Sequence, residues 1–308
     1  MKSHPRISEL LVEEAAFTDL DKPVILASGK ELGIYYINAE KLCQDGGAFR
    51  EHKDDSAAMI QHAVNMTQQH PTFNEVIDTI SAEVLANVIH GDRKGVAISG
   101  GQTRDWIFSG PVARKLELPH VSLYKQRTGE PDRVEIVYPD GRVKDASSGQ
   151  SLREFSPVHI VDMLTAGSSC YRIGGDKELG WIPMQRQRGA RIDNLLAVVT
   201  RCQGGEGRLA ELANTNAAGF VAIDEDFLTK YSTNPERALA YLKDPTAWSK
   251  QYLKEHGALA LLDTWNPEGG KLERAIKFTE KYADTLHEAG KFNELDAAVR
   301  EKFGIQLK

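Results

Sequence analysis

One stretch of the chain combines residue types suited to binding a phosphorylated sugar. Residues 158–169 read Val-His-Ile-Val-Asp-Met-Leu-Thr-Ala-Gly-Ser-Ser, an apolar run that ends in Asp162 and continues into small and hydroxyl-bearing residues. Such a run is typical of a buried parallel strand. The loop after it consists of Thr165, Ala166, Gly167, Ser168 and Ser169. Its backbone N–H groups and hydroxyls suit a phosphate, and Asp162 suits sugar hydroxyls or a hydrated metal ion, so the pattern favours a phosphate joined to ribose.

The same pattern also has a purely structural interpretation. A strand, a glycine- and serine-containing turn and a helix, here expected to start near Ser168, follow one another in every doubly wound fold, and many such turns bind nothing. The glycines match neither the P-loop pattern G-x-x-x-x-G-K-[ST] nor the dinucleotide pattern G-x-G-x-x-G, so neither of those sites is expected.

Composition limits the classes of protein that the chain can be. Its 308 residues, 41% of them apolar, suffice for one large domain or for a domain with an appendage. A net charge of −6 argues against a nucleic-acid-binding face, and no apolar run approaches the roughly 20 residues of a membrane span. The N-terminal segment resembles an amphipathic helix rather than a signal peptide.

Cysteine usage indicates the redox state of the thiols, and histidine usage bears on metal binding. Three widely spaced cysteines, Cys43, Cys170 and Cys202, indicate reduced thiols in a cytoplasmic protein rather than a disulfide framework. The nine histidines form no ligand cluster, so we expect no metal held by the protein alone.

Strand and helix patterns alternate through the middle of the chain. We expect strands at 95–99, 121–124, 158–162, 195–200 and 219–223, and helices at 103–116, 168–189 and 207–213, with a polar hairpin-like segment at 125–150. Before them we expect helices at 6–20, 55–69 and 72–90 and two short strands within 23–38; after residue 234 we expect only helices, among them 271–287 and 290–303. The alternation predicts an α/β fold with a parallel sheet.

Five segments occur in a fixed order and together carry a family resemblance. They are 26–38 (LASGKELGIYYIN), 99–105 (SGGQTRD), 122–129 (SLYKQRTG), 158–169 and 197–211 (AVVTRCQGGEGRLAE). In this order they resemble the orotate phosphoribosyltransferase family of the type I phosphoribosyltransferases. The resemblance covers roughly residues 15–230.

This resemblance implies a fold, a domain division and a reaction. The fold is a parallel sheet flanked by helices in a phosphoribosyltransferase domain at 1–230, with an N-terminal hood at about 1–50 and a helical extension at 231–308. The reaction transfers ribose 5-phosphate from phosphoribosyl pyrophosphate to a pyrimidine base, with orotate as the expected acceptor and orotidine 5′-phosphate and pyrophosphate as products. Mg²⁺ enters with the substrate near Asp162, and the protein is a cytoplasmic homodimer.

The resemblance also assigns roles to individual side chains. Lys125 and Arg127, on a mobile basic loop, would stabilise departing pyrophosphate, helped by Arg104. Arg201, after a strand, suits the carboxylate of orotate. Tyr35 and Tyr36 could stack near the base, although in a strand one of the two faces the core. For the basic residues the alternative is an ordinary surface cation, and for Arg201 it is a pair with a nearby acid.

Departures from the family pattern support two further hypotheses. The first of two adjacent acids is Val161, the hood lysine is Ala27, a loop lysine is Thr128 and the aspartate before the base-recognising arginine is Thr200. Each change removes a charge that would face the substrate. A catalytically weak ligand-binding or regulatory protein on the same fold is therefore the second hypothesis. A phosphoribosyltransferase for another base, or a hydrolase of a ribosyl phosphate, is the third.

Overall fold

The computed structural model describes residues 4–26, 29, 31–89, 93–125, 132–264 and 271–307. Contacts divide the chain into two compact units, one of Met1–Ala16 with Asn38–Asp224 and one of Phe17–Ile37 with Glu225–Lys308. The sequence division at 230 differs from this one, because residues 17–37, which are part of the expected hood, group with the C-terminal helices. The reason is that Leu32 packs into the apolar cluster of those helices.

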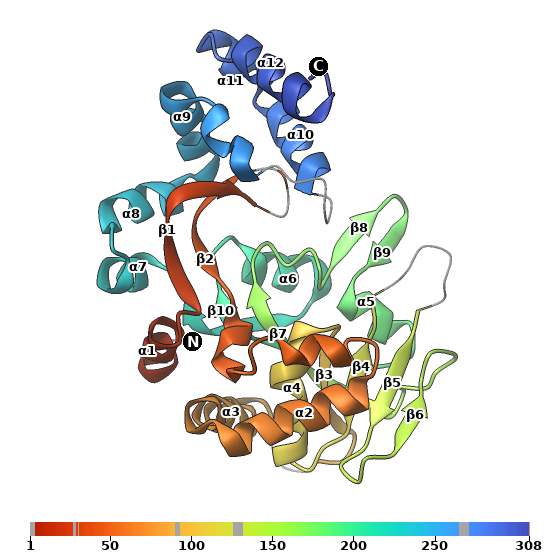
Figure 1. Cartoon of the computed structure of the whole chain (residues 1–308). Helices are drawn as coiled ribbons and strands as arrows, with labels where there is room; N and C mark the ends of the chain where they lie inside the picture. The colour runs from red at the N-terminus through yellow and green to blue at the C-terminus, as the bar shows by residue number, and fades with distance from the viewer. Residues whose placement is uncertain are drawn as a thin grey trace. The chain divides into compact units, whose positions relative to one another are not determined.

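The first unit is built on a seven-stranded sheet of order β11-β10-β7-β3-β4-β5-β6 (Figure 1). Its strands are β3 (Val96–Gly101), β4 (His120–Leu123), β5 (Val134–Val137), β6 (Val143–Asp145), β7 (Ser156–Leu164), β10 (Asn194–Thr200) and β11 (Asn216–Ala222). The run from β11 to β4 is parallel throughout, whereas β5 and β6 add an antiparallel edge. The predicted parallel α/β sheet and the hairpin-like segment after β4 are confirmed.

Helices of the first unit pack on both faces of this sheet. They are α1 (Pro5–Glu13), α2 (Ser56–Gln69), α3 (Pro71–Glu83), α4 (Arg104–Lys115), α5 (Trp181–Arg186) and α6 (Gly205–Ala213), with the short turns η1 (Ala39–Cys43), η2 (Ala48–His52) and η3 (Val84–Val88). A Cβ atom on Gly100 would meet Ser109 of α4, and one on Gly101 would meet Trp181 of α5. Since neighbouring strand residues face opposite ways, α4 and Trp181 lie on opposite faces.

Two expected helices are wrong in part. The helix expected at 6–20 ends at Glu13, and residues 17–25 form a strand that pairs with 32–37, because strand pairing overrides a helical apolar spacing. No helix begins at Ser168: residues 172–179 form the hairpin of β8 (Arg172–Gly174) and β9 (Lys177–Leu179), and α5 starts at Trp181. A two-residue connection with Gly175 at φ +65° favours the hairpin.

The second unit combines one antiparallel strand pair with helices. Its elements are β1 (Phe17–Ile25), β2 (Leu32–Ile37), α7 (Glu225–Tyr231), α8 (Pro235–Lys243), α9 (Pro245–His256), η4 (Leu259–Thr264), α10 (Lys271–Lys281), α11 (Ala283–Glu288) and α12 (Phe292–Phe303). The side chains of Asn234 and Asp244 cap α8 and α9, so each helix starts at the proline that follows its cap. The predicted all-helical C-terminal segment is confirmed for the residues described.

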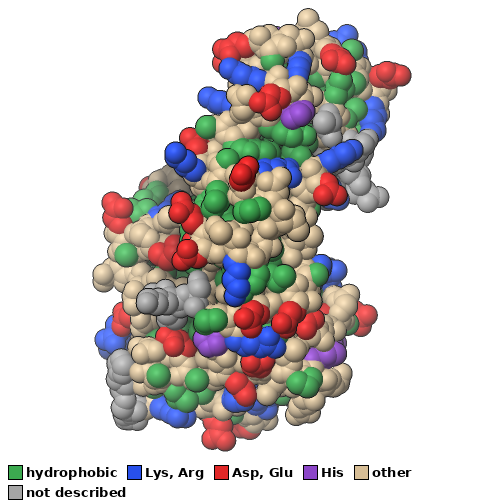
Figure 2. All heavy atoms as spheres, turned by 90° about the vertical axis from the view of Figure 1, so that its left-hand side faces the viewer, with side chains coloured by type: hydrophobic (Ala, Val, Ile, Leu, Met, Phe, Trp, Pro, Cys, Tyr) green, Lys and Arg blue, Asp and Glu red, His purple; other side chains and the backbone are tan. Residues whose placement is uncertain are grey.

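Figure 2 shows acidic and basic side chains interspersed over the face that it presents. Among the described residues, no helix has both the length and the apolar character that crossing a bilayer requires.

Candidate functional site

The carboxyl ends of four parallel strands gather most of the predicted site residues at one edge of the sheet. The Thr165–Ser169 loop follows β7, Arg104 follows β3, Lys125 follows β4 and Arg201 follows β10. Backbone bonds tie these ends together: the N–H of Arg201 donates to Leu164 O (2.9 Å). This is the edge where open α/β sheets bind ligands.

The Thr165–Ser169 loop has backbone donors available for a ligand. Among the described residues, no hydrogen bond uses the N–H groups of residues 165–169, although the carbonyl oxygen of Gly167 accepts from Cys170 and Tyr171. Gly167 has φ +72°, a conformation that glycine adopts without strain. Ser168 and Ser169 are exposed, so their hydroxyls also face solvent. These donors belong to the loop itself, since no helix starts at Ser168.

The glycine-rich turn after β10 packs closely against this loop. A Cβ atom on Gly205 would lie 2.2 Å from the carbonyl oxygen of Thr165, and one on Gly167 would lie 3.3 Å from Leu209. Helix α6 therefore reaches the loop only because residue 205 has no side chain. The structure thus gives the glycines of the 197–211 segment a packing role in shaping the loop.

Asp162 has a second carboxyl group beside it, which the sequence pattern did not reveal. The Oδ1 atom of Asp105 accepts the backbone N–H of Asp162 (2.9 Å), and its Oδ2 atom accepts that of Gly101 (3.0 Å). Burial and the neighbouring Asp162 carboxylate raise the pKa of Asp105 well above its usual range. Burial also raises the pKa of Asp162, against the opposing effect of Arg104. Val161, where the family has its first acid, is buried in the apolar core instead.

Arg104 lies between two carboxylates. Its Nε atom is 3.2 Å from Oε2 of Glu40, and its Nη1 atom is 3.9 Å from Oδ2 of Asp162. Glu40 is buried (6% exposed) and also pairs with Arg50 at 2.7 Å. Arg104 is thus held beside Asp162 by these two carboxylates while its side chain stays half-exposed, so it can reach an incoming anion.

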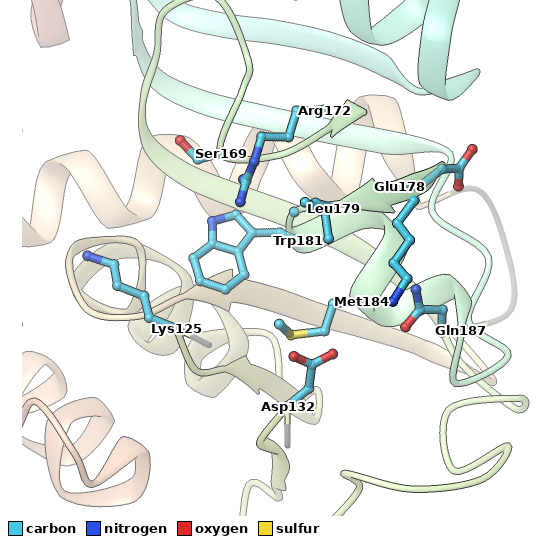
Figure 3. Close-up of a pocket in the computed structure, with 11 residues that line it drawn as sticks. Lys125, Asp132, Ser169, Arg172, Glu178, Leu179, Trp181, Met184 and Gln187 are labelled. Carbon is cyan, nitrogen blue, oxygen red and sulfur yellow. The ribbon is translucent and has the colours of Figure 1, made fainter. Parts of the chain in front are cut away.

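Lys125 is the described member of the predicted basic loop; Arg127 and Thr128 lie outside the described residues. The backbone N–H of Lys125 donates to Oε1 of Gln102 (2.9 Å), which links the segments that follow β3 and β4. Its side chain is exposed and lines a pocket of about 850 Å³ together with Ser169 (Figure 3). The structure therefore brings one predicted cation and one end of the Thr165–Ser169 loop, which we call the phosphate loop after its predicted ligand, to the same pocket.

The remaining predicted residues differ in exposure. Arg201 is buried (8% exposed) at the end of β10. Tyr35 is the core-facing member of the tyrosine pair, with its ring against Phe17 and Tyr241, whereas Tyr36 is 46% exposed. Both tyrosines belong to the second unit, and the hood positions Ala27 and Ser28 lie outside the described residues. The roles assigned to Arg201 and to the tyrosines stay predictions.

Two buried histidines lie within the sheet behind this edge. Ser99 Oγ is 2.9 Å from Nδ1 of His159, and Nε2 of His120 is 2.8 Å from Ser109 Oγ. Burial lowers the pKa of His159 to about 3, and burial with the neighbouring His159 lowers the pKa of His120 to about 3. Both rings are therefore neutral at pH 7 and act in packing rather than in proton transfer.

The donor set at this edge fits a metal ion only in one manner. No group of three or more His, Cys, Asp or Glu side chains suited to a metal occurs within the described part of the chain. The carboxyl groups of Asp162 and Asp105 lie together but cannot enclose an ion. One or two carboxylates plus substrate phosphates are a usual environment for Mg²⁺, so the residues fit an ion that arrives with a phosphorylated substrate.

Comparisons with known proteins found similar folds only. The sequence matches no protein-family profile and no curated protein sequence. Leishmania donovani UMP synthase is 15% identical over 77% of this chain, with a TM-score of 0.49, and this chain spans only 41% of that protein. Orotate phosphoribosyltransferase from Aeropyrum pernix is 18% identical over 73% of this chain and 97% of its own, with a TM-score of 0.46. Adenine phosphoribosyltransferase from Trypanosoma brucei is 12% identical over 72% of this chain and 81% of its own (TM-score 0.42).

Proposed function

We propose that the chain transfers ribose 5-phosphate from phosphoribosyl pyrophosphate to a nitrogenous base and releases pyrophosphate. The observation that carries the proposal is the Thr165–Ser169 loop. Its five backbone N–H groups have no acceptor among the described residues, and it begins three residues after Asp162, at the end of β7. A phosphate in the loop would satisfy those donors, and the attached ribose would lie within reach of the Asp162 carboxylate.

Different residues at this edge would bind different parts of the substrate. The loop would bind the 5-phosphate, and Asp162 would accept hydrogen bonds from ribose hydroxyls. Breaking the C1–O bond leaves the electron pair on pyrophosphate and an oxocarbenium-like centre on the sugar, which the base nitrogen attacks with its own pair. Arg104 and Lys125, with Arg127, would stabilise the pyrophosphate charge as it grows. Mg²⁺ bound by the substrate would neutralise part of the same charge.

Orotate is the acceptor that we propose, with a homodimer as the assembly. Arg201 lies at the carboxyl end of β10 and is buried, and a planar guanidinium pairs well with a carboxylate in such surroundings. Adenine and other bases without a carboxylate would gain nothing from that residue. The choice of acceptor can therefore be tested at Arg201 separately from the transfer reaction.

A catalytically weak phosphoribosyl-pyrophosphate-binding protein is the second candidate. Thr200, where the family has an aspartate, donates its hydroxyl to Oε1 of Glu206 (2.5 Å), and Val161 packs in the core. Neither position can therefore supply a charge to the substrate. This candidate keeps the phosphate loop and predicts binding without turnover.

Pyrophosphate release distinguishes these candidates. The protein is incubated with Mg²⁺, phosphoribosyl pyrophosphate and one base at a time: orotate, uracil, adenine, guanine or none. We expect release that depends on a base, with orotate preferred. Release with another base alone would reject orotate but keep the transfer, whereas binding without release for any base would support the second candidate. Release at the same rate without a base would indicate a hydrolase.

A further inference from the structure

The pocket beside the phosphate loop extends well beyond what ribose 5-phosphate needs. Its volume is about 850 Å³, within the range of sites that enclose whole small-molecule ligands. It is lined by Lys125, Asp132, Ser169, Arg172, Lys177, Glu178, Leu179, Gly180, Trp181, Met184 and Gln187 (Figure 3). Ser169 belongs both to the loop and to the pocket, so the pocket begins where the phosphate loop ends.

The wall of this pocket is attached to the loop by backbone contacts. The N–H of Trp181 donates to Ser169 O (3.1 Å), immediately after the β8–β9 hairpin. Gly180 has φ +117°, and a Cβ atom there would lie 2.7 Å from the same carbonyl oxygen. A residue with a side chain would therefore push the hairpin away from the loop. These contacts fix the distance between the β8–β9 hairpin and the Thr165–Ser169 loop.

Several cationic side chains of the lining have no carboxylate partner among the described residues. Among the described residues that line the pocket, the cations are Lys125, Arg172 and Lys177. Within the described ranges none of the three pairs with a carboxylate, and Arg172 only donates to the carbonyl oxygen of Ser168 (3.3 Å). The two acids are already engaged: Asp132 lies 3.7 Å from Arg188, and Glu178 accepts the hydroxyl of Tyr171 (2.7 Å). The pocket therefore favours an anion.

A mostly buried indole lies next to these cations, since Trp181 is only 9% exposed. The indole of Trp181 is fixed against Gly101, where an added Cβ atom would lie 2.3 Å from the ring. Figure 3 shows the Arg172 side chain extending toward the indole on one side, with Met184 and Asp132 on the other. An aromatic face beside a guanidinium suits a planar ring that carries a phosphate.

We propose that this pocket holds a ring-bearing group joined to the ribose 5-phosphate through a second phosphate, so that the chain binds a nucleoside diphosphate ribose. The inference rests on the proposed function, because that function places the 5-phosphate in the loop. The second phosphate contacts Arg172, and the ring contacts the small exposed part of the Trp181 indole. Lys125 and Lys177 add positive charge at the rim.

Calorimetric titrations with three ligands test this inference. ADP-ribose contains ribose 5-phosphate extended by an adenylate group, so ribose 5-phosphate alone and AMP alone are its two halves. We expect ADP-ribose to bind at least about tenfold more tightly than either half. One charge-assisted bond contributes about 1.5–3 kcal/mol, which corresponds to about tenfold or more, so Arg172→Ala should remove most of that preference. Arg153→Ala is the matched control, since Arg153 is also exposed and is not among the residues that line the pocket.

The outcomes separate this inference from the proposed function. Equal or weaker binding of ADP-ribose than of ribose 5-phosphate overturns the inference and leaves the transfer reaction intact. Binding of ADP-ribose that ribose 5-phosphate cannot displace also overturns it, because the pocket would then be independent of the loop. Equal loss of preference in both arginine variants would reject the role of Arg172. Pyrophosphate release, measured separately, decides the proposed function.

Discussion

Replacing Asp162 by asparagine should change ligand binding and stability in opposite directions. The substitution keeps the size of the side chain and the backbone N–H that donates to Asp105 (2.9 Å), but it removes the charge. A hydrogen bond between a carboxylate and a ribose hydroxyl contributes about 1.5–3 kcal/mol, so phosphoribosyl pyrophosphate should bind about tenfold to a hundredfold more weakly. Titration calorimetry measures this directly.

The stability effect follows from the raised pKa of Asp162. Because burial raises that pKa, the wild type loses stability as the pH rises through the folded-state value, and the neutral asparagine does not. In the wild type the Asp162 charge disfavours ionisation of the Asp105 carboxyl group. The variant lacks that charge, so the pKa of Asp105 should fall. We therefore expect the variant to unfold at a higher temperature than the wild type at pH 7, with the difference vanishing below about pH 4.

A matched control isolates the site from the general effect of losing a carboxylate. Asp193 precedes β10 at the opposite edge of the sheet, where it pairs with Arg191 at 2.7 Å. Asp193→Asn should leave ligand affinity unchanged. If Asp162→Asn binds phosphoribosyl pyrophosphate as the wild type does, the site assignment is refuted. If it is less stable at pH 7, the electrostatic reasoning is refuted.

Three further predictions concern the loop, the sheet and the leaving group. Gly205→Ala places a methyl group 2.2 Å from the carbonyl oxygen of Thr165, so the free energy of unfolding in urea should fall by about 1–3 kcal/mol. Gly207→Ala has open space around it and should be neutral or stabilising. Equal effects of the two substitutions would contradict the packing role of Gly205. Because the pKa of both His120 and His159 is about 3, each ring should lower the free energy of unfolding below pH 6.5 by up to about 1.4 kcal/mol per pH unit. The raised pKa values of Asp105 and Asp162 act in the opposite direction, so the check is the slope between pH 6.5 and 4.5 in His159→Phe relative to the wild type; an unchanged slope would refute the burial of His159 as a neutral ring. Lys125→Ala should lower kcat for pyrophosphate release about tenfold or more with little change in KM, and a change confined to KM would show that Lys125 acts only in binding.

The sequence predicts those parts of the site that depend on local pattern. The apolar run before Asp162 and the small residues after it identify β7 and its loop, because strand burial and turn formation both depend on residue types that are adjacent in the sequence. The alternation of strands and helices predicts that the ends of β3, β4, β7 and β10 share one edge. That topology suffices to bring Arg104, Lys125 and Arg201 to it.

The parts that the sequence does not reveal depend on contacts between distant residues. Asp105 and Asp162 are 57 positions apart, and nothing near either one indicates that their carboxyl groups meet. The pairing of Glu40 with Arg104 is equally remote in sequence. The hairpin at 172–179 has a local signal in its glycines, but the apolar spacing from 168 onward favours a helix, and only strand pairing decides between them.

A crystal structure with phosphoribosyl pyrophosphate and Mg²⁺ tests the central claim most directly. We expect the 5-phosphate in the Thr165–Ser169 loop, within hydrogen-bonding distance of several of its backbone N–H groups, with the ribose hydroxyls facing Asp162. A substrate phosphate bound elsewhere, with this loop closed by its own side chains, would contradict it.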